Sequence, residues 1–186
     1  MSNAKHTHVS NTIATPVGQL TLVGSDRGLA AILWEKDKPG RVRLNIVAQD
    51  IHHPVLLETE RQLGEYFAGR RKSFTVKLDF AGTAFQKKVW QALLTIPYGQ
   101  TRSYGQIASQ LGNPRAVRAV GAANGKNPIS IIAPCHRVIG ADGKQTGFAG
   151  GLQTKACLLE LESGALRLLP GSKGLAGSCA APAAGF

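Results

Sequence analysis

The sequence predicts two domains, a small α/β domain over residues 1–81 and a mainly helical domain over residues 82–168. Three observations lead to this division. Short apolar runs separated by turn residues fill the first part, helical spacing of apolar residues dominates the second, and the balance of charge differs between them. The remainder, residues 169–186, is rich in Gly, Ala, Pro and Ser and has little to bury, so we expect a disordered tail.

The first domain opens with three strand-like runs, at 11–15, 20–24 and 29–34. Turn-forming sequences at 16–18 and 25–28 separate consecutive runs. Short apolar strands joined by such turns predict a small antiparallel meander.

A helix and one further strand complete the predicted α/β domain. Apolar residues at helical spacing over 54–68, followed by Gly69, predict an amphipathic helix. Between Phe74 and Phe80 every second residue is apolar, which predicts one more strand. No catalytic constellation is found within this domain.

Helices are predicted at both ends of the second domain. Residues 84–95 carry apolar side chains, Phe85 among them, at a spacing that places them on one buried face. Residues 155–161 predict a final helix. Between the two ends, the Gly-rich stretch 140–151 predicts a loop whose backbone can lie close to a ligand.

The middle of this domain predicts a winged-helix-like, helix-turn-helix unit. Ser103 can cap a helix over 104–111. Asn113 then places a capping residue before Pro114 at the first position of another helix, which we expect to continue to about residue 124. Two short helices joined by such a tight turn are typical of DNA-binding proteins.

The second helix of that pair has an unusual face. Arg115, Arg118, Ala119 and Ala122 share one side of it and form a thin, positive ridge. Long side chains normally read the major groove, whereas a ridge of small residues permits close approach of the backbone, as a minor groove requires. An ordinary solvated basic helix is the alternative interpretation.

The charge is concentrated in the same domain. The chain has a formal net charge of +11; residues 1–81 hold 11 basic and 8 acidic side chains, and residues 82–168 hold 10 basic and 3 acidic ones. We therefore expect the second domain to bind a polyanion. Neither an apolar run long enough to span a bilayer nor a basic amphipathic helix with an aromatic face is found, so no membrane partner is expected.

The location of the protein follows from similar features. The polar N-terminus lacks the apolar core of a signal peptide. The three cysteines show no pairing signature, which fits a reducing compartment. We expect a cytoplasmic protein that is associated with the nucleoid when bound to DNA.

The adjacent Cys135 and His136 are the candidate reactive pair. A thiol is a nucleophile only as a thiolate, so it needs a base or positive neighbours, and His136 and Arg137 are candidates for both. In a strand, neighbouring side chains point to opposite faces, so contact through a water is favoured over direct contact. Two other interpretations are a buried structural cysteine and a metal site, but the Cys-x-x-Cys or His-x-x-x-His spacing of metal sites is absent.

Residues from about 85 to 162 resemble the O6-alkylguanine-DNA alkyltransferases, also called methylated-DNA–protein-cysteine methyltransferases. The resemblance is carried, in order and spacing, by Phe85-Gln86, Val89-Trp90, Ile96-Pro97-Tyr98-Gly99, Ser103-Tyr104, Gly112-Asn113-Pro114, Arg118-Ala119-Val120-Gly121, Asn127-Pro128, Pro134-Cys135-His136-Arg137-Val138-Ile139, Gly150-Gly151-Leu152 and Lys155. Residues 10–80 resemble the variable N-terminal domain of the family more weakly, which implies a ribonuclease-H-like fold there.

The resemblance implies catalytic roles for five residues. Cys135 is the alkyl acceptor, and His136 takes its proton through a water. Glu162 orients the imidazole, as in the usual order of nucleophile, base and orienting acid. Asn127 holds the turn that carries the active-site strand, and Tyr104 donates to the departing guanine and presses on the phosphate.

The resemblance also implies the surfaces that contact DNA. Arg118 enters the base stack in place of the flipped nucleotide, and the family reads DNA from the minor groove. The expected DNA-contacting residues are Asn113, Arg115, Arg118, Ala119 and Ala122, and the expected pocket for the alkylated base comprises Val138, Ile139, Phe148 and Ala149.

The implied activity is irreversible transfer of an alkyl group from O6-alkylguanine, and from O4-alkylthymine, in duplex DNA to Cys135. The thioether product is not reversed, so each molecule acts once, as a monomer and without metal or organic cofactor. Many family members carry Tyr where this chain has Phe148, which keeps the apolar wall for the base but loses the hydroxyl. The structural zinc of some members is not expected, because residues 1–81 contain no cysteine.

Two other classes of protein remain alternatives. Non-catalytic damage binders resemble the family but lack the acceptor cysteine, which is present here as Cys135. Helix-turn-helix regulators that sense methylation of a cysteine carry an additional Cys-rich N-terminal domain, which this chain does not contain.

Overall fold

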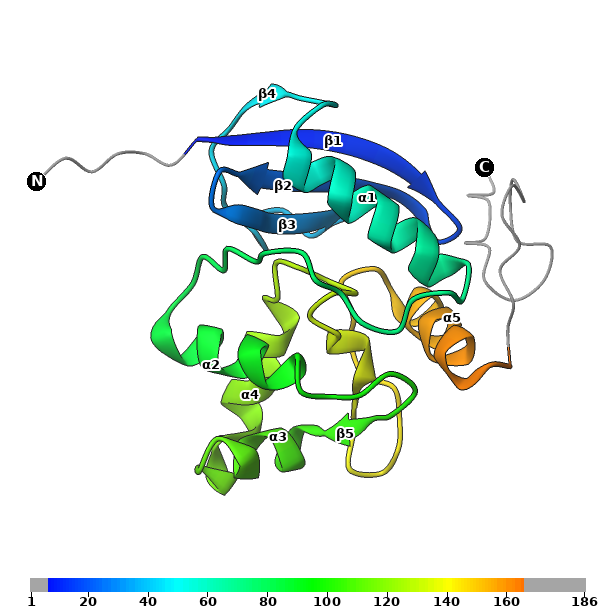
Figure 1. Cartoon of the computed structure of the whole chain (residues 1–186). Helices are drawn as coiled ribbons and strands as arrows, with labels where there is room; N and C mark the ends of the chain where they lie inside the picture. Colours follow the sequence, from blue (N-terminus) through cyan, green and yellow to red (C-terminus); the bar gives the residue numbers. More distant parts are fainter. Residues whose placement is uncertain (1–6, 166–186) are drawn as a thin grey trace, which may run out of the picture.

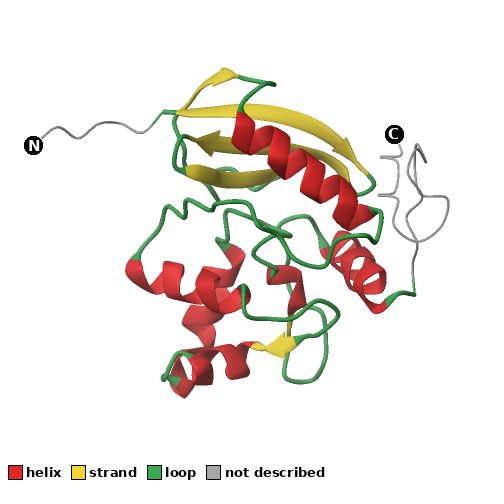
Figure 2. Cartoon of the chain, viewed as in Figure 1, coloured by secondary structure: helices red, strands yellow, loops and turns green. Residues whose placement is uncertain are grey.

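The computed structural model describes residues 7–165. A sheet covered by one long helix forms one half of the molecule, and shorter helices form the other (Figure 1). Figure 2 shows that nearly all of the strand structure lies in the first half. The predicted α/β and helical parts are therefore both present, while the predicted tail 169–186 lies outside the described residues. Within 7–165 no helix is long and apolar enough to cross a membrane.

The sheet has four strands in the order β3-β2-β1-β4. Strands β1 (His8–Thr15), β2 (Gly18–Ser25) and β3 (Gly28–Trp34) pair antiparallel, which confirms the predicted meander. Strand β4 (Ile46–Gln49) pairs parallel to β1 and was not predicted. All four of its residues are exposed, so they show none of the alternating burial that marks a strand in sequence.

The strand predicted between Phe74 and Phe80 is wrong. This segment pairs with β3 only at Leu78, beside Leu29. Two backbone hydrogen bonds flank the bridge, from Leu29 N to the Lys77 carbonyl and from Asp79 N to the Leu29 carbonyl, each of 2.8 Å. The alternating apolar side chains pack against the core, so the alternation reflects one buried side of an extended linker rather than a ladder.

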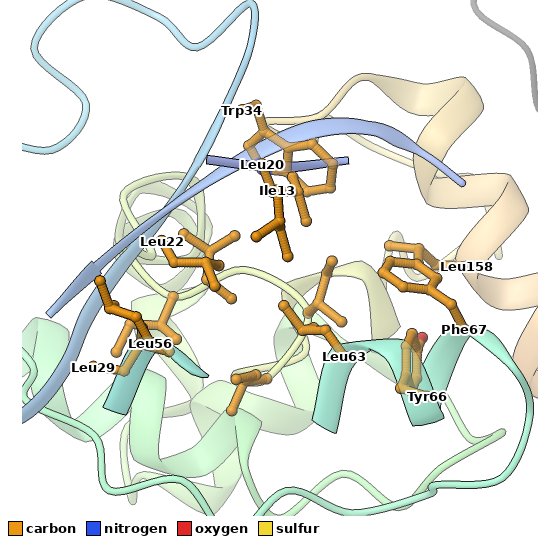
Figure 3. Packing of buried hydrophobic residues seen from close by; sticks show 14 of the residues in the cluster. Ile13, Leu20, Leu22, Leu29, Trp34, Leu56, Leu63, Tyr66, Phe67 and Leu158 are labelled. Atoms are coloured by element: carbon orange, nitrogen blue, oxygen red, sulfur yellow. The ribbon is translucent and has the colours of Figure 1, made fainter. Parts of the chain in front are cut away.

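Helix α1 (Pro54–Phe67) lies across the sheet and supplies much of the first core (Figure 3). Leu56, Leu63 and Tyr66 are fully buried. Leu57, one of the apolar residues of this helix, is 45% exposed, because the helix presents the neighbouring side to the sheet. The core contains Ile13, Leu20, Leu22, Leu29, Ile32, Trp34, Leu56, Leu63, Tyr66, Phe67, Ile129, Ile131, Ile132, Leu158 and Leu161.

Helix α2 (Ala84–Leu93) opens the helical half. The Thr83 hydroxyl accepts from the Gln86 N–H, and the Gln86 side chain accepts from the Thr83 N–H, so a capping box defines its start. Trp90 is buried, and its indole N–H donates to the Ala123 carbonyl at 2.9 Å. Phe85 is 36% exposed, so its expected inward position is wrong; it lies in the first turn, before the buried part of the helix.

Helices α3 (Tyr104–Gln110) and α4 (Val117–Gly125) form the predicted pair. Ser103 caps α3 as predicted and accepts from the Gln106 N–H. The capping role predicted for Asn113 is wrong. Its side chain makes no capping hydrogen bond, because the chain first forms a 3-10 turn, η1 (Pro114–Ala116), before α4 begins.

The last elements complete the helical half and join it to the first half. Strand β5 (Arg102–Ser103) pairs parallel with β6 (Val138–Ile139) within the helical half. Helix α5 (Leu152–Ser163) starts three residues before the predicted position and places Leu158 and Leu161 in the first core. In Figure 3 Leu158 lies close to Phe67, so the C-terminal helix packs against the N-terminal domain.

Candidate active site

Cys135 lies at the meeting point of the two halves. It is buried and begins a 3-10 turn, η2 (Cys135–Arg137). It also belongs to a second core, which the helical half forms from Val89, Trp90, Ala92, Leu93, Ile96, Ile107, Ala108, Val120, Ala123, Cys135 and Val138. A strand was expected at Cys135, and this expectation is wrong. Strand β6 begins only at Val138, after the 3-10 turn. In a 3-10 turn successive side chains lie about 120° apart rather than on opposite faces, so thiol and imidazole diverge less than in a strand.

Among the described cysteines, Cys135 is the free one. Cys157, on α5, is buried and disulfide-bonded. The expectation of three unpaired cysteines is therefore wrong for Cys157, and the cysteines give no support for a reducing compartment. Cys135 is the candidate nucleophile in the part of the chain that the structure describes.

The turn before Cys135 is held by Asn127. Its side-chain amide donates to the Ala133 carbonyl at 2.7 Å, and its side-chain oxygen accepts from the Ile129 N–H at 3.1 Å. Within this turn Ile131 adopts a φ of +72°, which is costly for a β-branched residue. The surrounding contacts must outweigh that strain, so the position of Cys135 is tightly determined.

The N-terminal domain supports the same turn. The Ile32 N–H of β3 donates to the Pro128 carbonyl at 2.9 Å. The Arg41 guanidinium donates to the Asn127 carbonyl and, at 3.3 Å, to the Ile32 carbonyl. The edge strand β3 and the loop after it therefore hold residues 127 and 128, which precede the thiol in the chain.

Glu162, on α5, is the centre of a buried polar cluster. His136 Nε2 lies 2.7 Å from Oε1, and the Arg137 guanidinium donates to both carboxylate oxygens at 2.8 and 2.9 Å. The Tyr66 hydroxyl of α1 donates to Oε1 at 2.8 Å, and the Gly99 N–H donates to Oε2 at 3.2 Å. None of these bonds involves Glu160, so the choice of Glu162 agrees with this geometry.

The charge states follow from burial and hydrogen bonding. Burial would raise the pKa of Glu162, but hydrogen bonds from His136 and Arg137 outweigh it and lower that pKa to about 2. Burial lowers the pKa of His136, against the opposing effect of Glu162. At neutral pH the carboxylate is therefore charged and the imidazole neutral.

This combination fixes the tautomer of His136. A carboxylate can only accept, so Nε2 must carry the hydrogen that is shared with Glu162. Nδ1 is then unprotonated, and it is buried without a hydrogen-bond partner among residues 7–165. The imidazole thus presents a basic nitrogen that no side chain of the cluster occupies, which suits a general base.

Burial and polar neighbours change the pKa of the Cys135 thiol in opposite directions. Burial raises the pKa of Cys135, while hydrogen bonds from the Asn127 and Ser130 side chains and the charges of Arg41 and Lys155 act in the opposite direction. Lys155 is itself buried, and its ammonium donates to the Val138 and Thr146 carbonyls at 2.6 and 2.9 Å. Loss of the thiol proton consequently requires assistance from a base.

The expected base-pocket residues lie on both sides of β6 and in the following loop. Val138 is buried next to Cys135 in the second core, and Ile139 is half-buried. Phe148 is half-buried and packs against both cores, and its ring lies edge-on to the His136 ring at 6.4 Å. Ala149, beside it, is also half-buried. Val138 is therefore part of the same core as Cys135, and Phe148 packs against that core.

The expected DNA-contacting residues lie on one exposed face. Arg118, Ala119 and Ala122 are exposed on α4, and Asn113 and Arg115 are exposed just before it. Val120 and Asn124 of the same helix are buried, whereas Val117 at its start is 39% exposed.

Tyr104 begins α3 and is half-buried. Its hydroxyl lies 2.7 Å from the Thr146 hydroxyl of the loop after β6. This contact places the tyrosine between the helix pair and the loop that leads to Phe148.

Both halves of the chain match one family of proteins. Residues 9–80 match the ribonuclease-like domain of 6-O-methylguanine DNA methyltransferase, and residues 84–164 match its DNA-binding domain. The chain belongs to the 6-O-methylguanine DNA methyltransferase family.

Individual members of the family are closely similar to this chain. The methylated-DNA–protein-cysteine methyltransferase of Mycobacterium leprae is 63% identical over 148 residues, covering 80% of this chain and 88% of its own length. The enzyme of the same name from Methanosarcina acetivorans is 51% identical over 149 residues, covering 80% and 94%. The crystal structure of Mycobacterium tuberculosis OGT in complex with DNA superposes with a TM-score of 0.73 at 49% identity, covering 85% and 93%.

Several residues of this methyltransferase-family site were not found from sequence. Tyr66, Trp34 and Arg41 belong to the first domain, which was expected to contribute no chemistry. Tyr66 and Trp34 occupy ordinary core positions of a helix and a strand, so no local pattern distinguishes them. Arg137 lies two residues after the thiol in the chain, but its guanidinium donates hydrogen bonds to Glu162.

Proposed function

We propose that this chain repairs alkylated DNA by direct reversal, transferring the alkyl group from O6-alkylguanine in duplex DNA to the sulfur of Cys135. The observation that carries the proposal is the buried free thiol beside a neutral His136, whose Nδ1 is unpartnered among the described residues and whose Nε2 is held by Glu162. The names of the similar proteins support the same activity.

The reaction begins with extrusion of the damaged nucleotide, because its alkyl carbon is inaccessible inside the duplex. His136 takes the thiol proton, through a water, and the sulfur attacks the alkyl carbon in line. The S–C bond forms as the C–O bond breaks, the bonding pair leaves with guanine, and the purine gains a proton, for which Tyr104 is the proposed donor. The thioether has no route back to a thiol, so each molecule acts once.

Recognition of DNA is proposed to use the exposed α4 face. The two alanines allow the helix backbone to approach the minor groove closely, and the guanidinium of Arg118 fills the space that the extruded base leaves. Asn113 and Arg115 contact the backbone beside it. Phe148, Ala149, Val138 and Ile139 line the pocket for the extruded base.

Three further points belong to the proposal. A single copy contains every proposed catalytic group, so we infer that the monomer is the active form. O4-alkylthymine is a second proposed substrate, because it presents the same alkyl–oxygen bond next to a ring nitrogen. Action on chromosomal DNA implies a cytoplasmic protein.

Mass spectrometry tests the transfer directly. The protein is mixed with duplex DNA that contains O6-methylguanine, digested, and the peptide containing Cys135 is weighed. We expect this peptide to gain one methyl group in place of one hydrogen, and Cys135→Ala to show no gain while still binding the duplex. Binding without any mass gain in the wild-type protein would instead indicate a non-catalytic damage binder.

A further inference from the structure

The loop after β6 is attached to the N-terminal domain at Trp34. Residues 141–147 of this loop are exposed, and residues 148–150 become half-buried where the loop reaches the end of β3. There the Phe148 ring lies edge-on to the indole of Trp34, with ring centroids 5.4 Å apart. Trp34 is buried in the first core, and Phe148 packs against that core. The N-terminal domain thus provides one of the contacts that hold the loop.

Gly150 brings the backbone of the loop directly onto the same indole. A Cβ atom at this position would lie 2.9 Å from Cδ2, Cε2 and Cε3 of Trp34, a separation that real Cβ atoms do not adopt. Gly150 has no positive φ, so the indole, and not the backbone conformation, accounts for the glycine. At Gly147, by contrast, an added Cβ would meet nothing within 4 Å.

A hydrogen bond fixes the direction of the indole ring. Its N–H donates to the Ser130 hydroxyl at 3.2 Å, and both residues are buried. Ser130 lies in the turn before Cys135, whereas Phe148 and Gly150 lie in the loop after it. Movement of the indole away from the loop would disturb this buried hydrogen bond, which costs free energy. Trp34 therefore joins the turn that precedes the thiol to the loop that follows it.

The helical domain holds the same loop at a different point. The Thr146 hydroxyl lies 2.7 Å from the Tyr104 hydroxyl, and the Lys155 ammonium donates to the Thr146 carbonyl at 2.9 Å. Phe148 comes shortly after this anchor in the chain and is held from the other side by Trp34. Loss of the indole should therefore leave the loop attached to the helical domain but allow Phe148 to move.

We propose that Trp34 is a positioning residue for substrate binding, because it holds Phe148 in place and so fixes one wall of the pocket for the alkylated base. The proposal rests on the proposed function, in which Phe148 lines that pocket. A wall that is fixed before the base arrives reduces the conformational entropy that binding must remove. The N-terminal domain thereby takes part in substrate binding without touching the substrate.

The test compares Trp34→Leu, Gly150→Ala and the double variant. Trp34→Leu keeps an apolar side chain in the core but removes the ring that contacts Phe148 and Gly150. Gly150→Ala adds the methyl group that the indole obstructs, and Gly147→Ala is its matched control in the same loop. Leu22→Ala, at a fully buried position of β2 in the same core, is the control for a general loss of stability.

Two measurements are made on each variant, after thermal unfolding has verified that it is folded. Hydrogen–deuterium exchange reports on the loop through the Gly151 N–H, which donates to the Phe148 carbonyl at 3.0 Å. The rate of methyl transfer is measured against the concentration of O6-methylguanine duplex in excess over the protein. This series separates the half-saturating concentration from the saturating rate.

In Trp34→Leu and in Gly150→Ala, exchange at Gly151 and the half-saturating concentration should each rise about tenfold, while the saturating rate stays within about twofold of the wild-type value. Adding Gly150→Ala to Trp34→Leu should have little further effect, because the added methyl group then meets no ring. Both controls should keep the wild-type values. Unchanged exchange in folded Trp34→Leu, or additive effects in the double variant, overturns the proposal.

Two arrangements keep the test decisive. If Trp34→Leu does not fold, Trp34→Phe replaces it, because phenylalanine keeps a ring in the core but is smaller than the indole and lacks its N–H; the same direction of change is expected. Faster exchange with an unchanged half-saturating concentration also overturns the proposal. Exchange requires no damaged DNA, so a loosened loop in a protein that transfers no methyl group would refute the proposed function while retaining the hold of Trp34 on the loop.

Discussion

The two domains contribute to the candidate site in opposite ways. The helical domain carries Cys135 and His136 next to each other in the chain, so the sequence marks them as a candidate pair and the family resemblance assigns their roles. The N-terminal domain contributes Tyr66, Trp34 and Arg41, which are far apart in sequence and meet at the site only in the fold. Groups that react can thus be concentrated in one segment, while the groups that hold them are distributed over the molecule.

The largest expected effect comes from the acid that joins the domains. Glu162→Gln removes the charge that holds the His136 tautomer and leaves the Arg137 guanidinium buried without its carboxylate. By analogy with other orienting acids, methyl transfer should slow roughly 100-fold or more, and stability should fall by about 3 kcal/mol.

Glu160→Gln is the matched control for this change. Glu160 lies on the same helix, is half-buried and takes no part in the hydrogen bonds between Glu162 and His136. Single-turnover rates of the two variants on methylated duplex make the comparison. Equal losses, or a larger loss in Glu160→Gln, would show that the orienting acid is assigned to the wrong residue.

The same acid predicts how stability depends on pH. The pKa of Glu162 is about 2 in the folded protein against 4.5 ordinarily, so its contribution is fully present above pH 4.5 and is lost as the pH falls toward 2. The shift corresponds to about 3 kcal/mol. The pKa of His136 is also lowered, and the folded protein resists its protonation, so stability starts to fall once the pH drops below 6.5.

Urea unfolding at a series of pH values measures this dependence. The wild-type free energy of unfolding should decline from pH 6.5 downward and continue to decline below pH 4.5. In Glu162→Gln the decline below pH 4.5 should be much smaller. Parallel curves for the two proteins in that range would contradict the assignment of a charged, buried Glu162.

Arg118 tests the role of the helical domain in handling DNA. Arg118→Ala removes the side chain proposed to occupy the space of the extruded base, so extrusion becomes less favourable. Repair of methylated duplex should slow about tenfold, a loss typical of one such contact, whereas dealkylation of free O6-benzylguanine should be unaffected. Equal losses on the two substrates would refute the intercalating role.

Binding of the wild-type protein to DNA should weaken as salt increases.

The smallest expected effect tests the contribution of the N-terminal domain through Tyr66. Tyr66→Phe removes one of five donors to Glu162 and keeps the ring packing, so transfer should slow only about threefold and stability should fall by about 1 kcal/mol. Tyr98→Phe is the control, because its hydroxyl donates to the Leu161 carbonyl rather than to the carboxylate. Indistinguishable rates for the two variants would show that the Tyr66 hydroxyl is not part of the site.

The same contrast explains what the sequence could and could not predict. Local signals identified the β1–β3 meander, α1 and the Ser103 cap, because turns and caps depend on neighbouring residues. Strand β4 and the linker after α1 were misjudged, because their pairing depends on distant segments.

The candidate site shows the same limit. The family resemblance pointed to Cys135, His136 and Glu162, and the structure brings the last two into contact. The 3-10 turn at Cys135 was not predicted, because it depends on the bonds of Asn127 and on the strained backbone at Ile131. Ser130 and Trp34 carry no signal in sequence, since their contact joins residues 96 positions apart.

The measurement that tests the central claim most directly is a titration of the protein with an excess of methylated duplex. The number of methyl groups removed is counted against the number of protein chains, and the mass of the Cys135 peptide is followed in parallel. Because the transfer converts the sulfur into a thioether, we predict a plateau at one methyl group per chain, with every Cys135 peptide modified. Continued removal of methyl groups beyond one equivalent, or a plateau with Cys135 unmodified, would contradict the account.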